Sequence, residues 1–460
     1  MYNYLCERAQ VLSHNHPLIV IFIAAVFVRL VNMGNIFVGD GTFVVEDDFY
    51  IQMATEWAQQ LGFMDGLPNN ESFRERMPLF PLLIALLSLL KMANPLGIVC
   101  VNCIIDSCTC VVVGKIGCRL NKRVGLLAGM LAAVWPNLII HSALVLGDTL
   151  FVCLFTGMLF WSIEYLEQPK KLTALFGGLF LGLAILTRPV ALFLAPAMLV
   201  ACFAIALYQN ISPRRAIFLA LMFIMPVAIT IGPLLVYNKI NFNSAVLSAQ
   251  TGTHLANWVV PPVKKIESGV SISDAKTGMS KKYSAELNRL KVINPNIFEQ
   301  SKILTSLALR ELSEVSVASI TQAWLQGMAI NLVAPAILVD NRIRKLSTQS
   351  FYHLEAPNFI TKVLLYVQGN GSIYLILFIL GVLGSVITLI LSLYGLFLVW
   401  SRFPWAAIFV MFAVLYFLLI NGPVASPKYR LPIEPIMIIC ASLSLVRVWK
   451  KVMPFNNTYE

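Results

Sequence analysis

The chain has 460 residues, of which 58% are hydrophobic and only 12% are charged. Soluble globular domains carry roughly 25% charged residues, so this composition excludes a soluble protein and indicates an integral membrane protein. The formal net charge of +11 does not indicate nucleic-acid binding, because much of the basic excess lies in short loops between apolar runs, where Lys and Arg set membrane orientation.

Ten apolar runs are long enough to cross a bilayer as helices, which takes about 20 residues each. These runs cover residues 17–38, 96–118, 124–140, 145–164, 172–187, 189–208, 216–238, 373–400, 404–421 and 430–449. Two further runs are ambiguous, because 78–93 is shorter and contains Pro78 and Pro81, and 314–338 is interrupted by polar side chains. We therefore predict an all-α polytopic membrane protein with about 10 transmembrane helices (range 10–12).

The basic clusters along the chain decide between these topologies. They lie at residues 115–123, 170–171, 214–215, 402 and 447–451. All of them can be cytoplasmic at once, as the positive-inside rule requires, only if 78–93 does not cross the membrane. We therefore expect 78–93 to be a juxtamembrane or half-inserted helix on the outer face. Both termini are then cytoplasmic, and 314–338 is a re-entrant or surface-lying element.

This topology divides the chain into three parts. Residues 1–238 form a transmembrane module that includes the first outer loop, 39–95, with its juxtamembrane helices. Residues 239–372 form an outer-face subdomain that contains the 314–338 element, and residues 373–460 form the C-terminal transmembrane helices. The very short cytoplasmic loops favour a bacterial inner membrane, with the outer loops on its periplasmic or extracellular face.

A run of three acids, Glu46-Asp47-Asp48, follows the first apolar run directly. Acidic side chains at a membrane surface are costly to desolvate and are usually solvated or functional. Apolar residues recur at four-residue spacing over 49–57, which predicts an amphipathic interfacial helix with the acids in its first turn. One acid would suffice to cap such a helix, so three adjacent acids favour a functional site.

Two other carboxylates stand out in the apolar regions. Asp148 opens a later span directly behind Gly147, on the outer face. It is either a plain helix N-cap together with Thr149, or the second carboxylate of a site shared with the first loop. Asp106 lies in the middle of a span, where we expect it to pair with a polar side chain of another helix and to have no catalytic role.

Few basic residues lie close to the membrane on the outer face, and those that do are exceptions to the positive-inside rule. The exceptions in proline-rich turns are Arg76, Arg188, Lys428 and Arg430. Proline stiffens the approach to a helix end, and an Arg side chain binds phosphate through a planar fork of donors. Each residue alone could anchor a lipid headgroup by snorkelling. Three such turns on the face that holds the acidic run favour a phosphate-binding site.

Four short motifs follow one another along the chain: Glu46-Asp47-x-x-Tyr50-x-x-x-Ala54, Arg76-x-Pro78-Leu-x-Pro81, Gly182-Leu-Ala-x-Leu-Thr-Arg188-Pro189 and Lys428-Tyr-Arg430-Leu-Pro432. In this order they resemble the GT-C superfamily of membrane glycosyltransferases. The resemblance is strongest to the branch that contains the protein O-mannosyltransferases and the aminoarabinose transferase of lipid A. It implies the GT-C fold, a polyprenyl-phosphate sugar donor, a site at the outer membrane face and inversion at the anomeric carbon.

The resemblance also implies roles for individual residues. The catalytic base of the first loop corresponds to Glu46 or Asp47: alignment on Tyr50 favours Glu46, whereas residue type favours Asp47. The acid of the family's second outer loop corresponds to Asp148. The neighbouring side chains expected to support the site are Asp48, Tyr50 and Tyr429.

The chemistry of sugar transfer from a polyprenyl phosphate suits these residue types. A carboxylate takes the proton from the acceptor hydroxyl, and positive charge holds the phosphate as it leaves. A phosphate is a good leaving group, so no second carboxyl group is needed as a general acid, in contrast to glycosidases. Clustered carboxylates can also bind Mg²⁺ or Mn²⁺. The mannosyltransferase-like branch is thought not to use a metal, so we expect neither a metal nor another cofactor.

We therefore predict an inverting glycosyltransferase that moves a sugar from a polyprenyl-phosphate carrier to a hydroxyl group of a protein, lipid or glycan acceptor. One alternative is a lipid-linked glycan polymerase or ligase, which also uses outer-face arginines but does not need an acidic helix after the first span. The other alternative is a polyprenyl-phosphate-sugar flippase or transporter, a class that often shows internal repeats, and no repeat is visible here.

Overall fold

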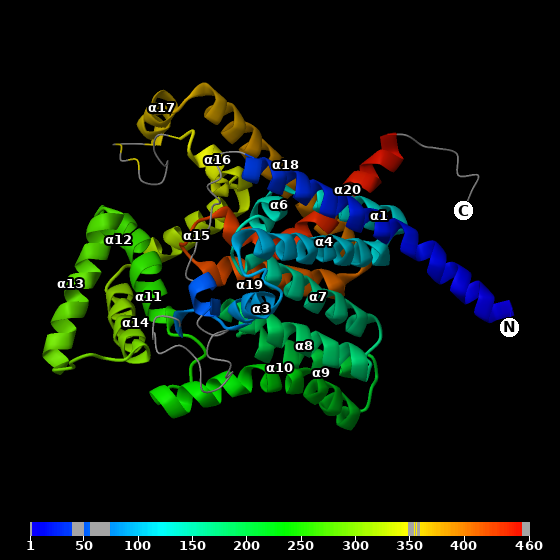
Figure 1. Cartoon of the computed structure of the whole chain (residues 1–460), viewed down its shortest axis with the longest axis horizontal. Helices are drawn as coiled ribbons and strands as arrows, with labels where there is room; N and C mark the ends of the chain where they lie inside the picture. Colours follow the sequence, from blue (N-terminus) through cyan, green and yellow to red (C-terminus); the bar gives the residue numbers. More distant parts are fainter. Residues whose placement is uncertain are drawn as a thin grey trace.

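The computed structural model describes residues 2–38, 50–55, 74–347, 354, 356 and 359–452 (Figure 1). Within these residues the regular secondary structure is helical, and no strand occurs. The long helices form one bundle, and a lobe that includes α12, α13 and α14 projects from one end of it. The start of α1 and the end of α20 lie at the other end.

In the described part of the chain, eight helical segments are long and apolar enough to cross a membrane. They are α1 (Tyr2–Val38), α4 (Pro95–Leu120), α7 (Asp148–Glu167), η2 (Pro189–Ala191) with α9 (Leu194–Tyr208), α10 (Pro213–Phe242), α18 (Ser372–Arg402), α19 (Pro404–Asn421), and η5 (Pro427–Ile433) with α20 (Glu434–Val452). A ninth span results if α5 (Lys122–Ala133) and α6 (Pro136–Ser142), which are bent by 48° at Pro136, cross together. The tenth predicted run is α8 (Lys171–Thr187), a shorter helix of 17 residues. Each predicted apolar run therefore coincides with a helix.

The two ambiguous runs are also helical, but neither qualifies as a span among the described residues. Helix α3 (Leu79–Leu89) has 11 residues, about 16 Å of helix, which is short of the roughly 30 Å hydrocarbon core. Helix α15 (Val317–Val333) has 17 residues and leads into the short turn η4 (Ala336–Val339). The outer-face position of both segments stays a prediction.

Small residues let the helices of the bundle approach closely. A Cβ atom at Gly178 of α8 would collide with the Phe223 carbonyl group of α10, and one at Gly395 of α18 would collide with the Cys440 carbonyl group of α20. Close backbone packing of this kind is a main source of helix association in membranes. Only 6% of the apolar stretch of α18 is buried, against 72% for α20. Helix α20 therefore lies at the centre of the bundle, and α18 faces lipid.

A buried ion pair joins the first two long helices. Arg29 of α1 approaches Asp106 of α4 with 2.5 Å between Nη2 and Oδ2, and each residue is only 1% exposed. The Arg29 guanidinium also donates to the carbonyl groups of Ala25 and Ala133 at 3.0 Å. The expectation that Asp106 pairs with a polar side chain of another helix is confirmed, and its partner is Arg29.

The lobe has a small core of its own. It consists of α11 (Gln250–His254), η3 (Leu255–Val259), α12 (Val260–Ser268), α13 (Ile272–Leu290) and α14 (Ile297–Ser313). Ala256, Val260, Met279, Leu307 and Ala308 pack together inside it. Two short helices, α16 (Asn341–Arg344) and α17 (Phe359–Gly369), then lead back to the bundle at α18.

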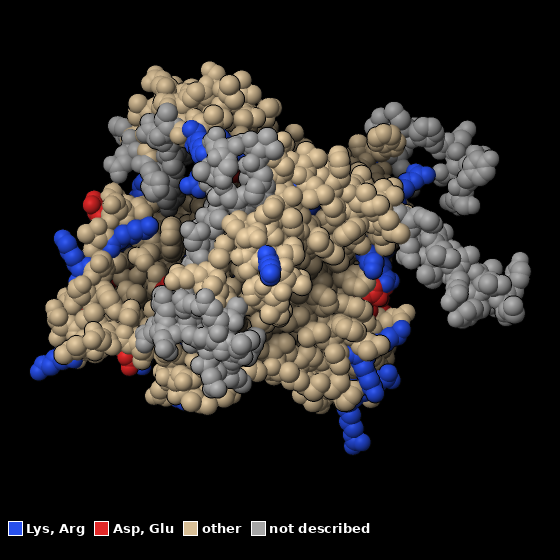
Figure 2. Space-filling model, in the orientation of Figure 1, with Lys and Arg blue, Asp and Glu red and all other residues tan. Residues whose placement is uncertain are grey.

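The charged residues of the face in Figure 2 follow this division. Lys and Arg gather on the lobe and at the opposite edge of the molecule, where the ends of α8 and α9 lie, and they are sparse on the surface between. A surface that is poor in charge in the middle and charged at its two ends is the pattern that a bilayer imposes on a helix bundle.

Candidate active site

The centre of the candidate site is Asp148, the first residue of α7. Its side chain is buried, and the residue is 4% exposed. Its Oδ1 atom forms an ion pair with the Arg188 guanidinium, and its Oδ2 atom lies 3.4 Å from Nζ of Lys428. The N-cap of α7 is Gly147, so Asp148 is not an N-cap. Its carboxylate interacts with the two cations instead. Three residues predicted separately from the sequence are thus brought together.

Each of the two cations is fixed by a proline-containing turn. Arg188 ends α8 in an extended conformation and is followed at once by Pro189 of η2. Lys428 lies in the first turn of η5, where its backbone N–H donates to Oγ of Ser426 at 3.3 Å. Burial alone would lower the pKa of Arg188, but the Asp148 carboxylate raises it overall, which keeps the guanidinium charged.

Tyrosine and arginine side chains from the first outer loop and η5 complete one side of this cluster. Tyr50 and Tyr429 are both close enough to Arg188 to interact with it electrostatically. The Arg76 guanidinium lies over the Tyr50 ring at 6.0 Å, and that ring packs edge-on against Phe80 with 5.2 Å between centroids. The predicted residues Tyr50 and Tyr429 therefore lie near Arg188, and Arg76 lies beside Tyr50.

The described part of the predicted interfacial helix supports this arrangement. Residues 50–55 are helical, and Met53 and Ala54 are each 1% exposed. Ala54 packs in a cluster with Phe80 and Ile84 of α3, which is the apolar face that the four-residue spacing predicts. The acidic residues Glu46, Asp47 and Asp48 lie outside the described residues, so their role stays a prediction.

The end of the first outer loop is bonded to the segment that follows α10. Arg74 lies over the Tyr237 ring at 5.0 Å and donates to its hydroxyl group at 3.3 Å. Ser248 donates to the Glu75 carbonyl group at 3.0 Å, and Thr253 donates to Oε1 of Glu75 at 2.8 Å. These bonds hold Arg76 beside the long outer segment.

His254, next in that segment, is near enough to Arg188 for their charges to interact. Burial, and then the positive charge of Arg188, lower the pKa of the His254 imidazole below its ordinary value. The imidazole is therefore neutral at pH 7. The long outer segment thus reaches the same cluster as the two proline turns.

Arg430 is directed away from the cluster. It is 6% exposed, its Nε atom donates to Oε1 of Glu434 at 2.8 Å, and its Nη1 atom donates to the carbonyl groups of Leu332 and Ala334 at 2.6 and 3.1 Å. Residues two apart on a 3₁₀-helix are rotated by about 240°, so Lys428 and Arg430 point in different directions. The structure gives Arg430 contacts that join η5 to the end of α15.

The sequence analysis assigned no role to His141, which is 1% exposed and borders Asp148. Its Nδ1 atom lies 2.9 Å from the Asn137 carbonyl oxygen. Because a carbonyl oxygen only accepts, Nδ1 carries the hydrogen, and in the neutral ring Nε2 is an acceptor. Nε2 is buried and has no hydrogen-bond partner among the described residues. His141 follows Asn137 by four residues, which on a helix places its side chain near the Asn137 carbonyl group. This spacing does not reveal where the Nε2 atom of His141 points.

A metal site is not evident in the described part of the chain. No group of three or more His, Cys, Asp or Glu side chains there is arranged to hold a metal ion. The Asp148 carboxylate is already engaged by two cations, which disfavours a third. Since Glu46, Asp47 and Asp48 are not described, the expectation of a metal-free site stays a prediction.

Comparisons with known proteins support the sequence resemblance. Residues 75–231 match the family model of the dolichyl-phosphate-mannose-protein mannosyltransferases. This match covers α3 to α9 and most of α10, and it includes Arg76, Asp148 and Arg188. No curated protein matches the chain.

Two solved structures of the archaeal oligosaccharyltransferase AglB from Archaeoglobus fulgidus share the fold. The complex with an inhibitory peptide and a dolichol-phosphate is 12% identical, has a TM-score of 0.51 and covers 97% of this chain and 52% of its own. The form tethered to an acceptor peptide is also 12% identical, has a TM-score of 0.53 and covers 95% and 50%. The chain therefore spans about half the length of these proteins.

A third structure is ArnT from Cupriavidus metallidurans bound to undecaprenyl phosphate. It is 13% identical and covers 94% of this chain and 78% of its own, but its TM-score of 0.38 is too low to support the fold. This multi-pass membrane protein thus matches the dolichyl-phosphate-mannose-protein mannosyltransferase family over residues 75–231, and over most of its length it shares the fold of AglB.

Proposed function

We propose that the chain is an inverting glycosyltransferase that moves a sugar from a polyprenyl phosphate to an acceptor hydroxyl group at the outer, periplasmic or extracellular face of the membrane. The observation that carries this proposal is the convergence of Arg188 and Lys428 on Asp148. Arg76 lies on the same side of the cluster, over Tyr50. These groups form a compact cationic site beside the outer loops.

The charges of this cluster suit a departing phosphate. Among the described residues of the cluster, three cations (Arg76, Arg188 and Lys428) and one carboxylate (Asp148) give a formal sum of +3 − 1 = +2, before the acidic run Glu46-Asp47-Asp48 is counted. The donor phosphodiester carries one negative charge, and the released phosphomonoester carries about −1.5 to −2 at pH 7. The cations therefore interact more strongly with the leaving group than with the bound donor, which lowers the barrier to transfer.

In this scheme Asp148 positions the cations. Protonating its carboxylate would remove the counter-charge that holds Arg188 and Lys428, so it is poorly suited to act as a base. Glu46 or Asp47 takes the proton from the acceptor hydroxyl group. The acceptor oxygen then attacks the anomeric carbon from the face opposite the phosphate, and the bond between this carbon and the phosphate oxygen breaks.

Covalent geometry is compatible with a base at either position. Asp47 is three positions before Tyr50, which keeps their Cα atoms within about 11 Å of each other. Tyr50 in turn lies beside Arg76 and Arg188. This reach allows a base at either position to lie close to the phosphate site. His141 Nε2 offers this site a hydrogen-bond acceptor for a hydroxyl group of the sugar or the acceptor.

The proposed partners are a polyprenyl-phosphate-linked sugar and a protein, lipid or glycan acceptor. AglB has been solved with an inhibitory peptide and a dolichol-phosphate, and in another structure with a tethered acceptor peptide, which supports a lipid-linked donor. The long outer segment, which contacts the first loop at Glu75 and reaches Arg188 through His254, is the part of this chain best placed to meet an acceptor.

The test is a transfer assay with labelled polyprenyl-monophosphate sugars, using purified protein in liposomes. We expect acceptor-dependent release of the lipid phosphate, and a loss of kcat of roughly 10²-fold in Arg188→Ala and in Lys428→Ala. Lys239→Ala is the matched control, because Lys239 is exposed and its Nζ atom bonds to Asn243 instead. Glu46→Gln and Asp47→Asn identify the base, and full activity in both would contradict this proposal.

Two further measurements distinguish this transferase from a glycan polymerase or ligase and from a flippase. A glycan polymerase or ligase would use a diphosphate-linked oligosaccharide and ignore the monophosphate. A flippase would move the labelled lipid between leaflets without releasing the sugar from its phosphate. Either result would replace the proposed activity.

A further inference from the structure

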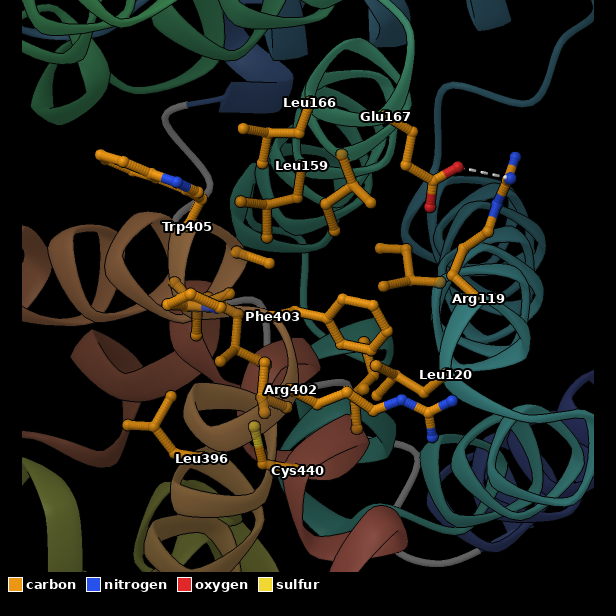
Figure 3. A pocket seen from close by; sticks show the side chains of 18 residues that line it. Arg119, Leu120, Leu159, Leu166, Glu167, Leu396, Arg402, Phe403, Trp405 and Cys440 are labelled. Carbon is orange, nitrogen blue, oxygen red and sulfur yellow. Dashed lines mark hydrogen bonds and ion pairs between the residues drawn. The ribbon is translucent and has the colours of Figure 1, made fainter. Parts of the chain in front are cut away.

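A cavity lies at the end of the bundle opposite the Asp148 cluster. It has a volume of about 330 Å³ and is framed by α4, α7, α18, α19 and α20 (Figure 3). Helix α7 begins at Asp148 and ends at Glu167, which borders the cavity, so its 20 residues separate the two sites by about 30 Å. The cavity is thus distinct from the candidate active site.

Most of the cavity wall is hydrocarbon. Leu159 and Leu166 of α7, Leu396 of α18, Phe403 and Cys440 line it (Figure 3). An apolar cavity of roughly 150 Å³ stays dry in proteins and binds small hydrocarbons. This cavity is larger, and it lies between candidate membrane spans. Its lining therefore favours an alkyl chain over water.

The border of the cavity carries a cation that has no counter-charge in the described part of the chain. Arg119 is paired with Glu164 and Glu167. Arg402, at the end of α18, is exposed and has no carboxylate partner among the described residues. Its guanidinium lies over the Phe403 ring at 5.5 Å. A guanidinium at a membrane surface is well suited to bind phosphate.

The surroundings of the cavity carry further positive charge. Arg123, Lys170 and Lys171 are near the same ends of α4, α7 and α8 and belong to the basic clusters that predict the cytoplasmic face. Anionic headgroups are drawn to such a surface by about 1 kcal/mol per basic residue, as for juxtamembrane segments in general. The hydrocarbon wall, the unpaired cation and the basic surroundings together define the chemistry of one ligand.

We propose that this cavity binds an acyl chain of an anionic glycerophospholipid whose phosphate group is held by Arg402. The lipid would fill the space between α18 and α19 on one side and α4 and α7 on the other. This site does not depend on the proposed sugar transfer, because it lies at the other end of α7 and uses none of the residues of the Asp148 cluster.

The experiment is native mass spectrometry of the full-length protein after delipidation. The protein is titrated with phosphatidylglycerol, phosphatidylcholine and undecaprenyl phosphate. We expect one tightly retained phosphatidylglycerol per protein, and a loss of affinity of about tenfold in Arg402→Ala with no change for phosphatidylcholine. Cys440→Phe places a ring in the cavity and should reduce the binding of both phospholipids.

Arg447→Ala is the control for a non-specific charge effect, because Arg447 is an exposed residue near the end of α20 that does not line the cavity. It should bind phosphatidylglycerol like the unchanged protein. Equal affinity of the unchanged protein and Arg402→Ala for phosphatidylglycerol would overturn the proposal. Tighter binding of undecaprenyl phosphate than of phosphatidylglycerol, abolished by Cys440→Phe, would overturn the identity of the ligand. Arg402→Ala changes an exposed residue, so this test stands even if Cys440→Phe fails to fold.

Discussion

The Arg188 guanidinium forms an ion pair with the Asp148 carboxylate, 40 positions earlier in the chain, while Lys428 approaches the second oxygen of the same group. One carboxylate therefore sets the position of two cations from different proline turns. Opposite charges in a partly buried site interact far more strongly than in water. The geometry of the cationic site depends on Asp148.

Replacing Asp148 with Asn tests this dependence. The amide preserves the shape of the side chain but leaves Arg188 and Lys428 without a counter-charge. We expect kcat to fall by roughly 10²-fold, because the cations lose their fixed positions, with a smaller change in the KM for the donor. Steady-state kinetics over a range of donor concentrations measures both.

The control for Asp148→Asn is Glu164→Gln, which removes a carboxylate paired with Arg119 near the other end of α7. It should leave both kinetic constants unchanged. An Asp148→Asn enzyme with unchanged kcat would show that the ion pairs do not matter for transfer.

Replacing Arg430 tests whether its role is structural. Removing one partner of a buried ion pair leaves the other charge uncompensated, which typically destabilises a protein by about 3–5 kcal/mol. Glu434 is 0% exposed, so we expect Arg430→Met to lower the free energy of unfolding by an amount in that range. Thermal or denaturant unfolding in detergent measures the loss.

The double variant Arg430→Met/Glu434→Leu removes both charges and should recover most of the stability. In both variants we expect the KM for the donor to stay close to that of the unchanged protein. If the double variant recovers its stability but has an increased KM for the donor, Arg430 contributes to phosphate binding, as the sequence predicts.

The stability of the lobe should depend on pH through Glu311. Burial alone would raise the pKa of this carboxyl group, but hydrogen bonds from Lys264 and Lys282 lower it below its ordinary value of 4.5. A carboxyl group whose folded-state pKa is depressed adds stability at pH values above its unfolded-state pKa. That stability is lost as the pH falls through the folded-state pKa. The contacts of α14 with α12 and α13 should therefore loosen below about pH 4.5.

Hydrogen exchange of α13 and α14 between pH 7 and pH 3, corrected for intrinsic rates, measures this effect. Glu311→Gln should show faster exchange at pH 7 and a weaker dependence on pH. Glu314→Gln, an exposed neighbour on the same face of the lobe, is the control and should behave like the unchanged protein. A pH dependence that persists in Glu311→Gln would assign it to another group.

A methyl group at Gly178 should separate α8 from α10. The added Cβ atom would collide with the Phe223 carbonyl group, which belongs to a helix backbone and cannot rotate away. Overpacking of this kind typically costs about 1–3 kcal/mol, so we expect Gly178→Ala to lower the melting temperature. Gly232→Ala in α10 is the control, because its Cβ atom would meet open space. Equal melting temperatures in the two variants would contradict the close approach.

The helices of this fold could be predicted from the sequence because length and apolar composition determine which segments can cross a bilayer. All ten predicted runs are helical, and the resemblance to the GT-C superfamily is confirmed. The convergence of Asp148, Arg188 and Lys428 could be anticipated only as a set of outer-face residues. Their order in the sequence does not say which carboxylate oxygen meets which cation.

The directions of single side chains could not be predicted from the sequence. Lys428 and Arg430 point in different directions because residues two apart on a helix lie on different faces, whereas the sequence around Pro427 predicts only a proline-rich turn. The free acceptor of His141 depends on which backbone carbonyl oxygen its other nitrogen reaches. The pairing of Arg29 with Asp106 depends on how α1 packs against α4, which the sequence alone does not give.

The two bonds that Glu75 accepts, from Ser248 and Thr253, join segments that are more than 170 positions apart in the chain. The first outer loop and the segment after α10 cannot separate unless both bonds break. A ligand that orders one of these segments therefore also restricts the other, so a second ligand loses less conformational entropy when it binds. Donor and acceptor should accordingly bind with positive cooperativity, even though neither needs to touch the other before transfer.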